Sequence, residues 1–301
     1  MGTPHDRRRR QLAFGALSSS GLAAVDVLWR SARAQQAAPG GPMRVVSVGG
    51  ALTEIVYALG AESVLVGTDT TSLYPQAAQR TTKVGYARSL SAEGVLSLRP
   101  TVMLASSEAG PPTVLAQLQS AGLRLVRAEP GYGPAALLAN VERVGEALGR
   151  AREADALRAQ LDTQWRETIA RLRGAPGGAR PRVLFVLSHV ASNVQVSGAN
   201  TAAAAMIELA GGANALGGFN GYRPLTAEAV VAAAPDAILT TAQGAEALGG
   251  ADRLLAQPGL ALTPAGRARR VLALDALYLL GGGPRLPRAV AELARFLGTL
   301  A

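Results

Sequence analysis

Short apolar segments alternate with amphipathic ones along the chain, and this alternation predicts strands and helices in turn. The expected strands of the first half are 44–48, 64–66, 102–105 and 123–127, and the expected helices are 53–59 and 113–121. The second half repeats the order with strands at 182–187, 237–240 and 270–274 and helices at 202–210 and 288–300. Strands that alternate with helices are typical of βαβ units. Both halves therefore predict an α/β fold with mainly parallel sheets.

One stretch of the first half occurs again in the second. Leu-Ser-Ala-Glu at 90–93 leads through an apolar run to Pro100, and Leu-Thr-Ala-Glu at 225–228 leads in the same way to Pro235. A Gly-Tyr pair precedes each copy, at 85–86 and at 221–222. The copies lie about 135 residues apart, which is the size of a small domain and too long for a solenoid repeat. We expect two similar lobes with a ligand cleft between them.

A long amphipathic stretch lies between the two halves. Residues 151–173 keep an apolar face and predict one stiff helix of about 30 Å, which ends at the Gly-rich segment 174–178. Such a helix either bridges the lobes or covers the surface of one of them, and the pattern fits both. The expected division is an export signal at 1–34, an N-terminal α/β lobe at 43–133, a helical linker with the bridging helix at 134–178, and a C-terminal α/β lobe at 179–301.

The N-terminus has the pattern of an export signal. Arginines at 7–10 precede a mildly apolar segment at 12–28 and an Ala-x-Ala site at 32–34, so we expect cleavage after Ala34. The paired arginines resemble a twin-arginine signal, and export by the general route stays open. The alternative is a basic tail on an amphipathic helix. No later apolar run reaches the roughly 18 residues of a membrane span, so we expect the mature chain to be soluble.

Charge and composition exclude several classes of protein. Six arginines and two aspartates lie in residues 1–34, so four of the nine net positive charges belong to the expected signal, and the rest follow no basic stripe typical of nucleic-acid binding. The absence of cysteine excludes disulfides, thiolate metal sites and a lipidated cysteine. Nucleophile-elbow, dinucleotide and P-loop motifs are absent, and the glycines at 281–283 before Pro284 predict a turn. We therefore expect a protein that is not an enzyme.

Five stretches of the chain carry a resemblance to a known family. They are Val-Gly-Gly-Ala-Leu-Thr-Glu-Ile at 48–55, Asp-Thr-Thr-Ser-Leu-Tyr-Pro at 69–75, Gly-Tyr-Ala-Arg-Ser-Leu-Ser-Ala-Glu-Gly at 85–94, Val-Leu-Ser-His at 186–189 and Gly-Tyr-Arg-Pro-Leu at 221–225. The chain resembles the periplasmic haem-binding proteins of bacterial haem-uptake ABC transporters, which share a class with cobalamin- and siderophore-binding proteins. The Ser-x-Tyr-Pro loop and the Gly-Tyr-x-Arg run point to the haem branch, whereas the paired Glu helices occur throughout the class.

The resemblance implies haem b as the transported ligand, bound in the cleft with its iron on Tyr74. Ferric haem accepts a tyrosinate as axial ligand, which makes Tyr74 chemically suitable. The resemblance also implies that Arg88 and Arg223 reach the cleft from opposite lobes and pair with a haem propionate or the tyrosine oxygen. The further expected pocket residues are Tyr86 and Tyr222. His189 is either a ligand or contact of a second haem or a structural histidine.

The partners expected from the resemblance are an inner-membrane ABC permease dimer with its ATPase, and an outer-membrane haem receptor upstream. Glu93 and Glu228 begin equivalent helices, where the helix dipole favours a carboxylate even without a partner. The resemblance implies instead that they meet arginines on the two permease subunits. We expect a monomer that binds no nucleic acid. The alternatives are a protein of the same class for a ferric siderophore or cobalamin, or a haem-handling module outside transport.

Overall fold

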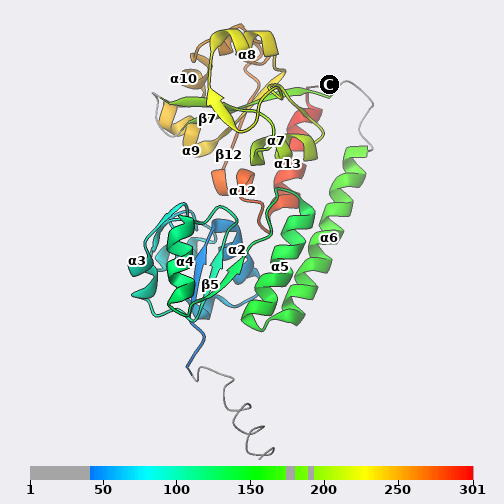
Figure 1. The fold of residues 1–301 in the computed structure, drawn as a ribbon. Coiled ribbons are helices and arrows are strands. Elements are labelled where there is room, and N and C mark those ends of the chain that lie inside the picture. Colours follow the sequence, from blue (N-terminus) through cyan, green and yellow to red (C-terminus); the bar gives the residue numbers. More distant parts are fainter. Residues whose placement is uncertain (1–40, 174–179, 189–192, 301) are drawn as a thin grey trace, which may run out of the picture. The chain divides into compact units, whose positions relative to one another are not determined.

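The computed structural model describes residues 41–173, 180–188 and 193–300. The expected export signal, the Gly-rich segment after the long helix and His189 lie outside these residues. Residues 43–301 cluster as one unit of the chain. Within it, strands build two separate larger sheets, each surrounded by helices (Figure 1). We call these two parts the N-lobe and the C-lobe.

The N-lobe contains a parallel sheet with the strand order β2-β1-β5-β6. Its strands are β1 (Val45–Val48), β2 (Leu65–Thr68), β5 (Val102–Ala105) and β6 (Arg124–Arg127). The central strands β1 and β5 are buried along their whole length, as expected of a parallel sheet covered on both faces. Alternate side chains of β1 therefore enter two different cores: Val45 packs with α2 (Gly50–Ala58), and Val46 packs with α4 (Pro112–Ser120).

The C-lobe contains a mixed sheet with the order β10-β8-β7-β11-β12, and β9 pairs with β7. Its strands are β7 (Arg182–Ser188), β8 (Val194–Ser197), β9 (Ala213–Asn214), β10 (Tyr222–Pro224), β11 (Ala237–Thr241) and β12 (Val271–Leu274). Strands β7, β9, β11 and β12 pair in parallel, whereas β8 pairs antiparallel with both β7 and β10. Strands β8 and β10 were not expected from the sequence. Residues 189–193 alone separate β7 from β8, and so short a connection permits only antiparallel pairing.

The duplicated stretch has the same structure in both lobes. Helices α3 (Ala92–Leu96) and α8 (Ala227–Ala233) begin behind the capping hydroxyls of Ser91 and Thr226. Each helix leads to a central strand, β5 or β11, which pairs with β1 and β6 in one lobe and with β7 and β12 in the other. The residues before the two prolines, with φ of 46° and 42°, are both left-handed. The prediction of two similar lobes is confirmed.

Two helices connect the lobes along the chain. Helix α5 (Pro134–Leu148) covers α2, and α6 (Ala151–Arg173) has the bounds predicted from its apolar face. Helix α6 packs along α5 and against α13 (Leu286–Gly298), as Figure 1 shows. One hydrophobic core extends from β1 of the N-lobe through α5, α6 and α13 to β7 of the C-lobe. A continuous core makes these helices part of both lobes.

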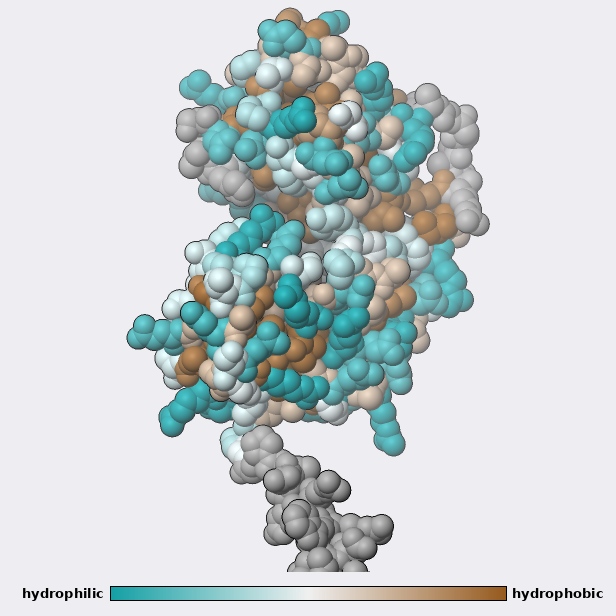
Figure 2. All heavy atoms as spheres, in the orientation of Figure 1, coloured by the Kyte–Doolittle hydropathy of each residue, from teal (hydrophilic) through white to brown (hydrophobic). Residues whose placement is uncertain are grey.

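The remaining helices surround the C-lobe sheet and the loops of both lobes. They are α7 (Ala202–Leu209), α9 (Ala242–Leu248), α10 (Ala251–Leu255), α11 (Pro264–Arg267), α12 (Ala276–Leu280), and the short 3-10 helices η1 (Glu62–Val64), η2 (Gln76–Arg80) and η3 (Leu260–Leu262). A two-stranded hairpin of β3 (Gly85–Tyr86) and β4 (Ser89–Leu90) completes the N-lobe. On the face shown in Figure 2, hydrophilic and hydrophobic residues are interspersed. Within the described ranges, none of the helices has the length and apolar character of a membrane span.

Candidate functional site

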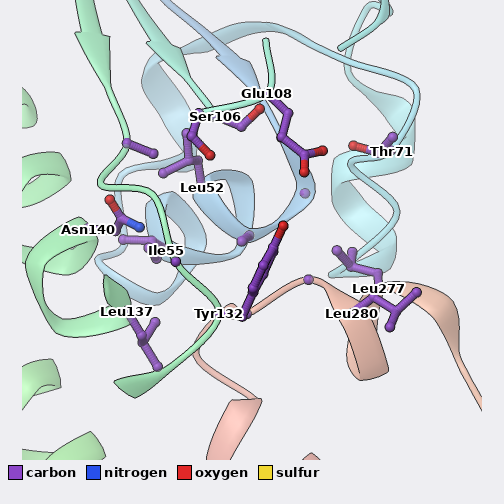
Figure 3. Close-up of a pocket in the computed structure, with 18 of the residues that line it drawn as sticks. Leu52, Ile55, Thr71, Ser106, Glu108, Tyr132, Leu137, Asn140, Leu277 and Leu280 are labelled. Atoms are coloured by element: carbon purple, nitrogen blue, oxygen red, sulfur yellow. The ribbon is translucent and has the colours of Figure 1, made fainter. Parts of the chain in front are cut away.

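A cavity of about 420 Å³ opens where three parts of the fold meet. The first part is the carboxyl ends of β1, β5 and β6, where ligand sites of parallel sheets are commonly found. The second is the start of α5, and the third is α12 with the glycine turn that follows it. The leucine and isoleucine side chains of the lining are Leu52, Ile55, Leu73, Leu137, Leu277 and Leu280. Figure 3 shows the Tyr132 ring projecting into this space with its hydroxyl end toward Glu108.

Tyr74 lies in the loop beside this cavity and is 46% exposed. The loop begins at Asp69, whose fully buried carboxylate accepts hydrogen bonds from the backbone N–H groups of Gly49 (2.9 Å) and Thr71 (3.0 Å) and from the hydroxyl of Ser72 (2.7 Å). Hydrogen bonds to a charged acceptor are among the stronger ones in proteins. The loop is thus tied to the start of α2 while Tyr74 itself remains exposed.

Lys83 ties down the other end of the same loop. Its Nζ donates to the hydroxyl of Thr68 (2.8 Å) and to the carbonyl oxygens of Ser72 (3.2 Å) and Ala78 (3.1 Å). Burial lowers the pKa of Lys83, and the nearby Asp69 carboxylate opposes that change. Residues 68–78 are therefore fixed by side-chain contacts on both sides of Tyr74.

Arg285 covers the Tyr74 ring. Its guanidinium carbon lies 3.7 Å from the centre of the ring, within the range of a cation–π contact. The same guanidinium donates two hydrogen bonds to the Glu54 carboxylate, from Nε to Oε2 (2.9 Å) and from Nη2 to Oε1 (2.6 Å). Burial raises the pKa of Glu54, and the hydrogen bond from Arg285 opposes the rise. The three side chains form one unit at the edge of the cavity.

Sequence reasoning did not single out Arg285 or Glu54 as site residues. Each of the two residues has a feature in the sequence that could have indicated a role in the site. Glu54 is a carboxylate among the apolar residues of α2, and it is 5% exposed. Arg285 follows the glycines at 281–283 and Pro284, a segment that was interpreted only as a turn. A buried acid needs a partner, and an arginine placed by a turn can supply it.

Arg88 lies at the tip of the β3–β4 hairpin and binds Glu108. Its Nε donates to Oε2 of Glu108 at 3.1 Å, and both side chains are about half exposed. The hydrogen bond that Arg88 donates to Glu108 raises the pKa of Arg88, and electrostatic interactions with Glu108, Tyr86 and Tyr132 contribute. Arg88 is therefore paired with a carboxylate that itself lines the cavity.

Tyr222 approaches Arg88 and Glu108 from the C-lobe. It is 37% exposed, and its ring packs edge-on against Phe185 with 6.4 Å between the ring centres. Burial raises the pKa of Tyr222, while a hydrogen bond with Thr201 opposes the rise. It is also close enough to interact electrostatically with Tyr132, Glu108 and Arg88 of the N-lobe half of the molecule. Tyr222 thus comes near Arg88 from the other lobe, whereas the expected approach of Arg88 and Arg223 to one cleft stays a prediction.

The other predicted residues are placed less closely together. Arg223 lies over the ring of Phe219, with 4.5 Å between its guanidinium carbon and the ring centre. Glu93 and Glu228 are exposed in the first turns of α3 and α8, as the duplication implied. His189 falls outside the described residues, so its role stays a prediction.

Four tyrosines are exposed around the cleft: Tyr74, Tyr86, Tyr132 and Tyr222. They make up four of the nine large hydrophobic residues that are exposed in the described part of the chain. Exposed aromatic rings that gather in one place indicate a binding surface, because their faces gain by covering an apolar ligand. Tyr132 was missed, although it belongs to a third Gly-Tyr pair, at 131–132.

Histidine and acidic side chains do not form a metal site in the described ranges, where no three of them lie close enough to hold an ion. The exposed tyrosines offer phenol oxygens, a type of ligand that ferric iron accepts. Together with the apolar lining of the cavity, their rings can cover a flat, largely apolar molecule.

A sequence model of the protein family described as periplasmic binding protein matches residues 45–278 of the chain. The chain belongs to this family. Among solved structures, it is 49% identical to the periplasmic haem-binding protein BhuT in complex with two haems, with a TM-score of 0.82 over 87% of this chain and 100% of that one. It is 40% identical to apo RhuT, a periplasmic haem-binding protein from Roseiflexus sp. RS-1, with a TM-score of 0.83 over 86% of this chain and 99% of that one.

A curated relative is the uncharacterised ABC transporter substrate-binding lipoprotein YvrC of Bacillus subtilis (strain 168). It is 29% identical over 255 residues, which are 84% of this chain and 79% of that protein. The match with the structures extends over both lobes and agrees with the two-lobed α/β fold of this family. The resemblance given by the motifs is confirmed at the level of the family.

Proposed function

We propose that this protein binds haem in the cleft between its lobes and delivers it to an inner-membrane ABC permease for haem and iron uptake. The observation that carries the proposal is the group of exposed tyrosines that both lobes contribute around one apolar cavity. Such rings can cover the faces of a porphyrin, and arginines nearby can pair with its propionates. The two haem-binding relatives of 49% and 40% identity support the same ligand. The transported form is haem b.

Tyr74 is the axial ligand in this proposal. Its loop is fixed through Asp69 and Lys83, so little ordering remains to be done when the iron arrives. The ring is exposed and already held by Arg285. Ferric iron in haem accepts a tyrosinate oxygen, and a single protein ligand suits a carrier that must release its cargo.

Arg88 and Arg223 take the propionates, and Tyr86 and Tyr222 line the pocket. Arg88 pairs with Glu108, so a haem propionate that binds Arg88 would replace one carboxylate by another. Both side chains of that pair are about half exposed, and exposed ion pairs of this kind contribute only about 0–1 kcal/mol. The exchange is therefore easy. His189 is the candidate ligand or contact for a second haem.

The other parts of the proposal concern the cell. An export signal at 1–34 directs the chain to the periplasm, where it acts as a monomer made of an N-terminal lobe (43–133), a helical linker (134–178) and a C-terminal lobe (179–301). Haem reaches it from an outer-membrane receptor. Glu93 and Glu228 then orient its docking on the permease dimer, which an ATPase drives. The role is one of binding, without catalysis.

A haemin titration followed by visible absorption tests the ligand. The proposal predicts saturable binding with the high-spin spectrum of a ferric tyrosinate, and no competition from cobalamin or a ferric siderophore in large excess. Tyr74→Phe should remove that spectrum, while Tyr57→Phe, on α2 and outside the cavity lining, should keep it. Displacement of haemin by cobalamin or a siderophore would support the alternative ligand, and an unchanged spectrum in Tyr74→Phe would remove the assignment of the iron ligand.

The same titration decides the role of His189. Two equivalents of haemin with distinct spectra, of which His189→Ala loses one, would make His189 a ligand of a second haem. A single equivalent in both proteins would make it a structural residue.

Transport in a reconstituted permease tests the docking role. Replacing Glu93 and Glu228 together by Ala should leave haem binding intact and reduce uptake, because exposed ion pairs orient an encounter more than they hold it. The control replaces Glu62 and Glu246, which are equally exposed. Equal uptake by both double variants would contradict the docking role.

A further inference from the structure

We infer that Arg285, held in place by Glu54, positions the Tyr74 ring for the haem iron. The inference rests on the proposed function, and it adds to that function a residue pair that sequence analysis had given no role. Arg285 lies between α12 and α13, Glu54 lies on α2, and Tyr74 follows β2. Side chains from three separate segments of the chain thus meet at one aromatic ring.

The first argument is the state of the ring itself. Nearly half of Tyr74 is exposed, and an exposed tyrosine ordinarily samples more than one rotamer. Here a flat guanidinium lies 3.7 Å from the ring centre and covers one face. The backbone of the loop is already tied through Asp69, so the side-chain torsions are the freedom that remains. Arg285 is the contact that limits them.

The second argument is that Arg285 cannot easily move away. Its side chain is 20% exposed and that of Glu54 only 4%, and the two share a bidentate pair. A planar fork that meets a carboxylate with two hydrogen bonds fixes orientation as well as distance. Its guanidinium carbon also lies 5.2 Å from the Tyr278 ring centre, and the Tyr278 hydroxyl donates to Glu292 of α13 at 3.1 Å. The guanidinium plane is therefore set by its surroundings.

The third argument is that Arg285 acts on Tyr74 through its planar shape more than through its charge. Glu54 compensates the positive charge of Arg285, so the pair presents to Tyr74 a flat surface with little net charge. A lysine at this position would keep the charge but would lack the plane and the second hydrogen bond. Arg285→Lys therefore separates an electrostatic role from a positioning role.

The test compares haem complexes of wild type, Arg285→Gln, Arg285→Lys and Arg288→Gln. Arg288 is exposed in the first turn of α13, which begins directly after Arg285, and it serves as the control for loss of one charge. The readouts are the tyrosinate-to-iron charge-transfer band and the rate of haem transfer to apomyoglobin. Residues that support a metal ligand are typically worth about 10- to 100-fold in affinity. We expect both Arg285 variants to shift the band and to release haem about tenfold faster or more, and Arg288→Gln to match wild type.

A second variant keeps the test valid where the single substitutions fail to fold. Replacing Glu54 and Arg285 together by Leu removes the buried charges as a pair, which such sites often tolerate. This double variant should fold and still show the altered band. An unchanged band and release rate in it, or full function of Arg285→Lys, would overturn the positioning role. Tyr74→Phe distinguishes the two proposals, because it tests the iron ligand whether or not Arg285 matters.

Discussion

Two arginine–glutamate pairs stand at the cleft, and they differ in almost every physical respect. Arg88 and Glu108 have side chains that are 59% and 48% exposed, at a hairpin tip and on the cavity lining. Arg285 and Glu54 have side chains that are 20% and 4% exposed, and they join α13 to α2. The first pair is exposed to solvent and to any ligand. The second is part of the framework below the proposed iron ligand.

The difference shows how similar residues can have separate tasks in one site. An exposed pair is screened by water and salt, so a ligand carboxylate can replace its acid at little cost in free energy. A buried pair cannot exchange partners, because either member alone would remain as an uncompensated charge. We therefore assign ligand exchange to Arg88 and geometry to Arg285.

The largest expected effect is on stability at the buried pair. Arg285→Ala leaves the Glu54 carboxylate without its partner, and we expect a loss of about 3–5 kcal/mol in the free energy of unfolding. Urea denaturation measures it. The double replacement of both residues by Leu should recover much of the loss. A loss below about 1 kcal/mol in Arg285→Ala would show that this pair behaves like an exposed one.

The pH dependence of stability sharpens the same point. Burial raises the pKa of Glu54 above its ordinary value of 4.5, and the hydrogen bond from Arg285 limits the rise. A carboxyl group that holds its proton more tightly when folded favours the folded state at low pH, and this contribution is lost as pH rises above 4.5. Arg285→Gln should therefore lose stability more steeply than wild type between pH 4.5 and neutrality.

Denaturation curves at a series of pH values provide this measurement. The control is the double variant in which Glu54 is also replaced by Gln, since it has no carboxyl group to titrate at this place. It should lose the additional slope. The same slope in the single and double variants would assign the titration to another group.

The exposed pair should show the opposite profile, with little effect on stability and a visible effect on binding. Arg88→Gln should change the free energy of unfolding by less than about 1 kcal/mol, and yet weaken haem binding through the loss of a propionate partner. Calorimetric melting and haemin titration measure the two effects. Equal haem affinity in wild type and Arg88→Gln would exclude Arg88 as a propionate partner.

The smallest expected effect has the opposite sign. Glu108→Gln removes the carboxylate that competes for Arg88, so haem should bind more tightly, by at most about fivefold. The gain should shrink at high salt because both groups are exposed. Weaker binding in Glu108→Gln would mean that Glu108 supports the ligand and does not compete with it.

Local patterns were sufficient for much of the fold. The apolar face of 151–173 predicted α6 to the residue, and the repeated Glu-to-Pro stretch predicted equivalent central strands, β5 and β11, in both lobes. The strands β8 and β10 were missed because they are short, and β10 is exposed along its whole length, so it has no alternating apolar pattern. Pairing at a sheet edge depends on the neighbouring strand more than on the strand's own residues.

Site residues were predicted only in the stretches of sequence that resemble a known family. Tyr74, Arg88 and Glu54 lie in stretches that resemble a family, and the roles of Tyr74 and Arg88 stay predictions. Arg285 and Glu54 are 231 residues apart, and only the folded chain reveals that they form a pair. Glu108 carries no motif, and its pairing with Arg88 likewise depends on tertiary structure. Contacts between distant segments are thus the part that periodicity and spacing cannot supply.

A crystal structure of the protein with bound haem tests the central claim most directly. The measured quantity is the distance between the haem iron and Oη of Tyr74. Our account predicts a direct bond between them, with Arg285 still against the ring and paired with Glu54. An iron bound to another side chain, or a haem outside the cleft, would contradict it.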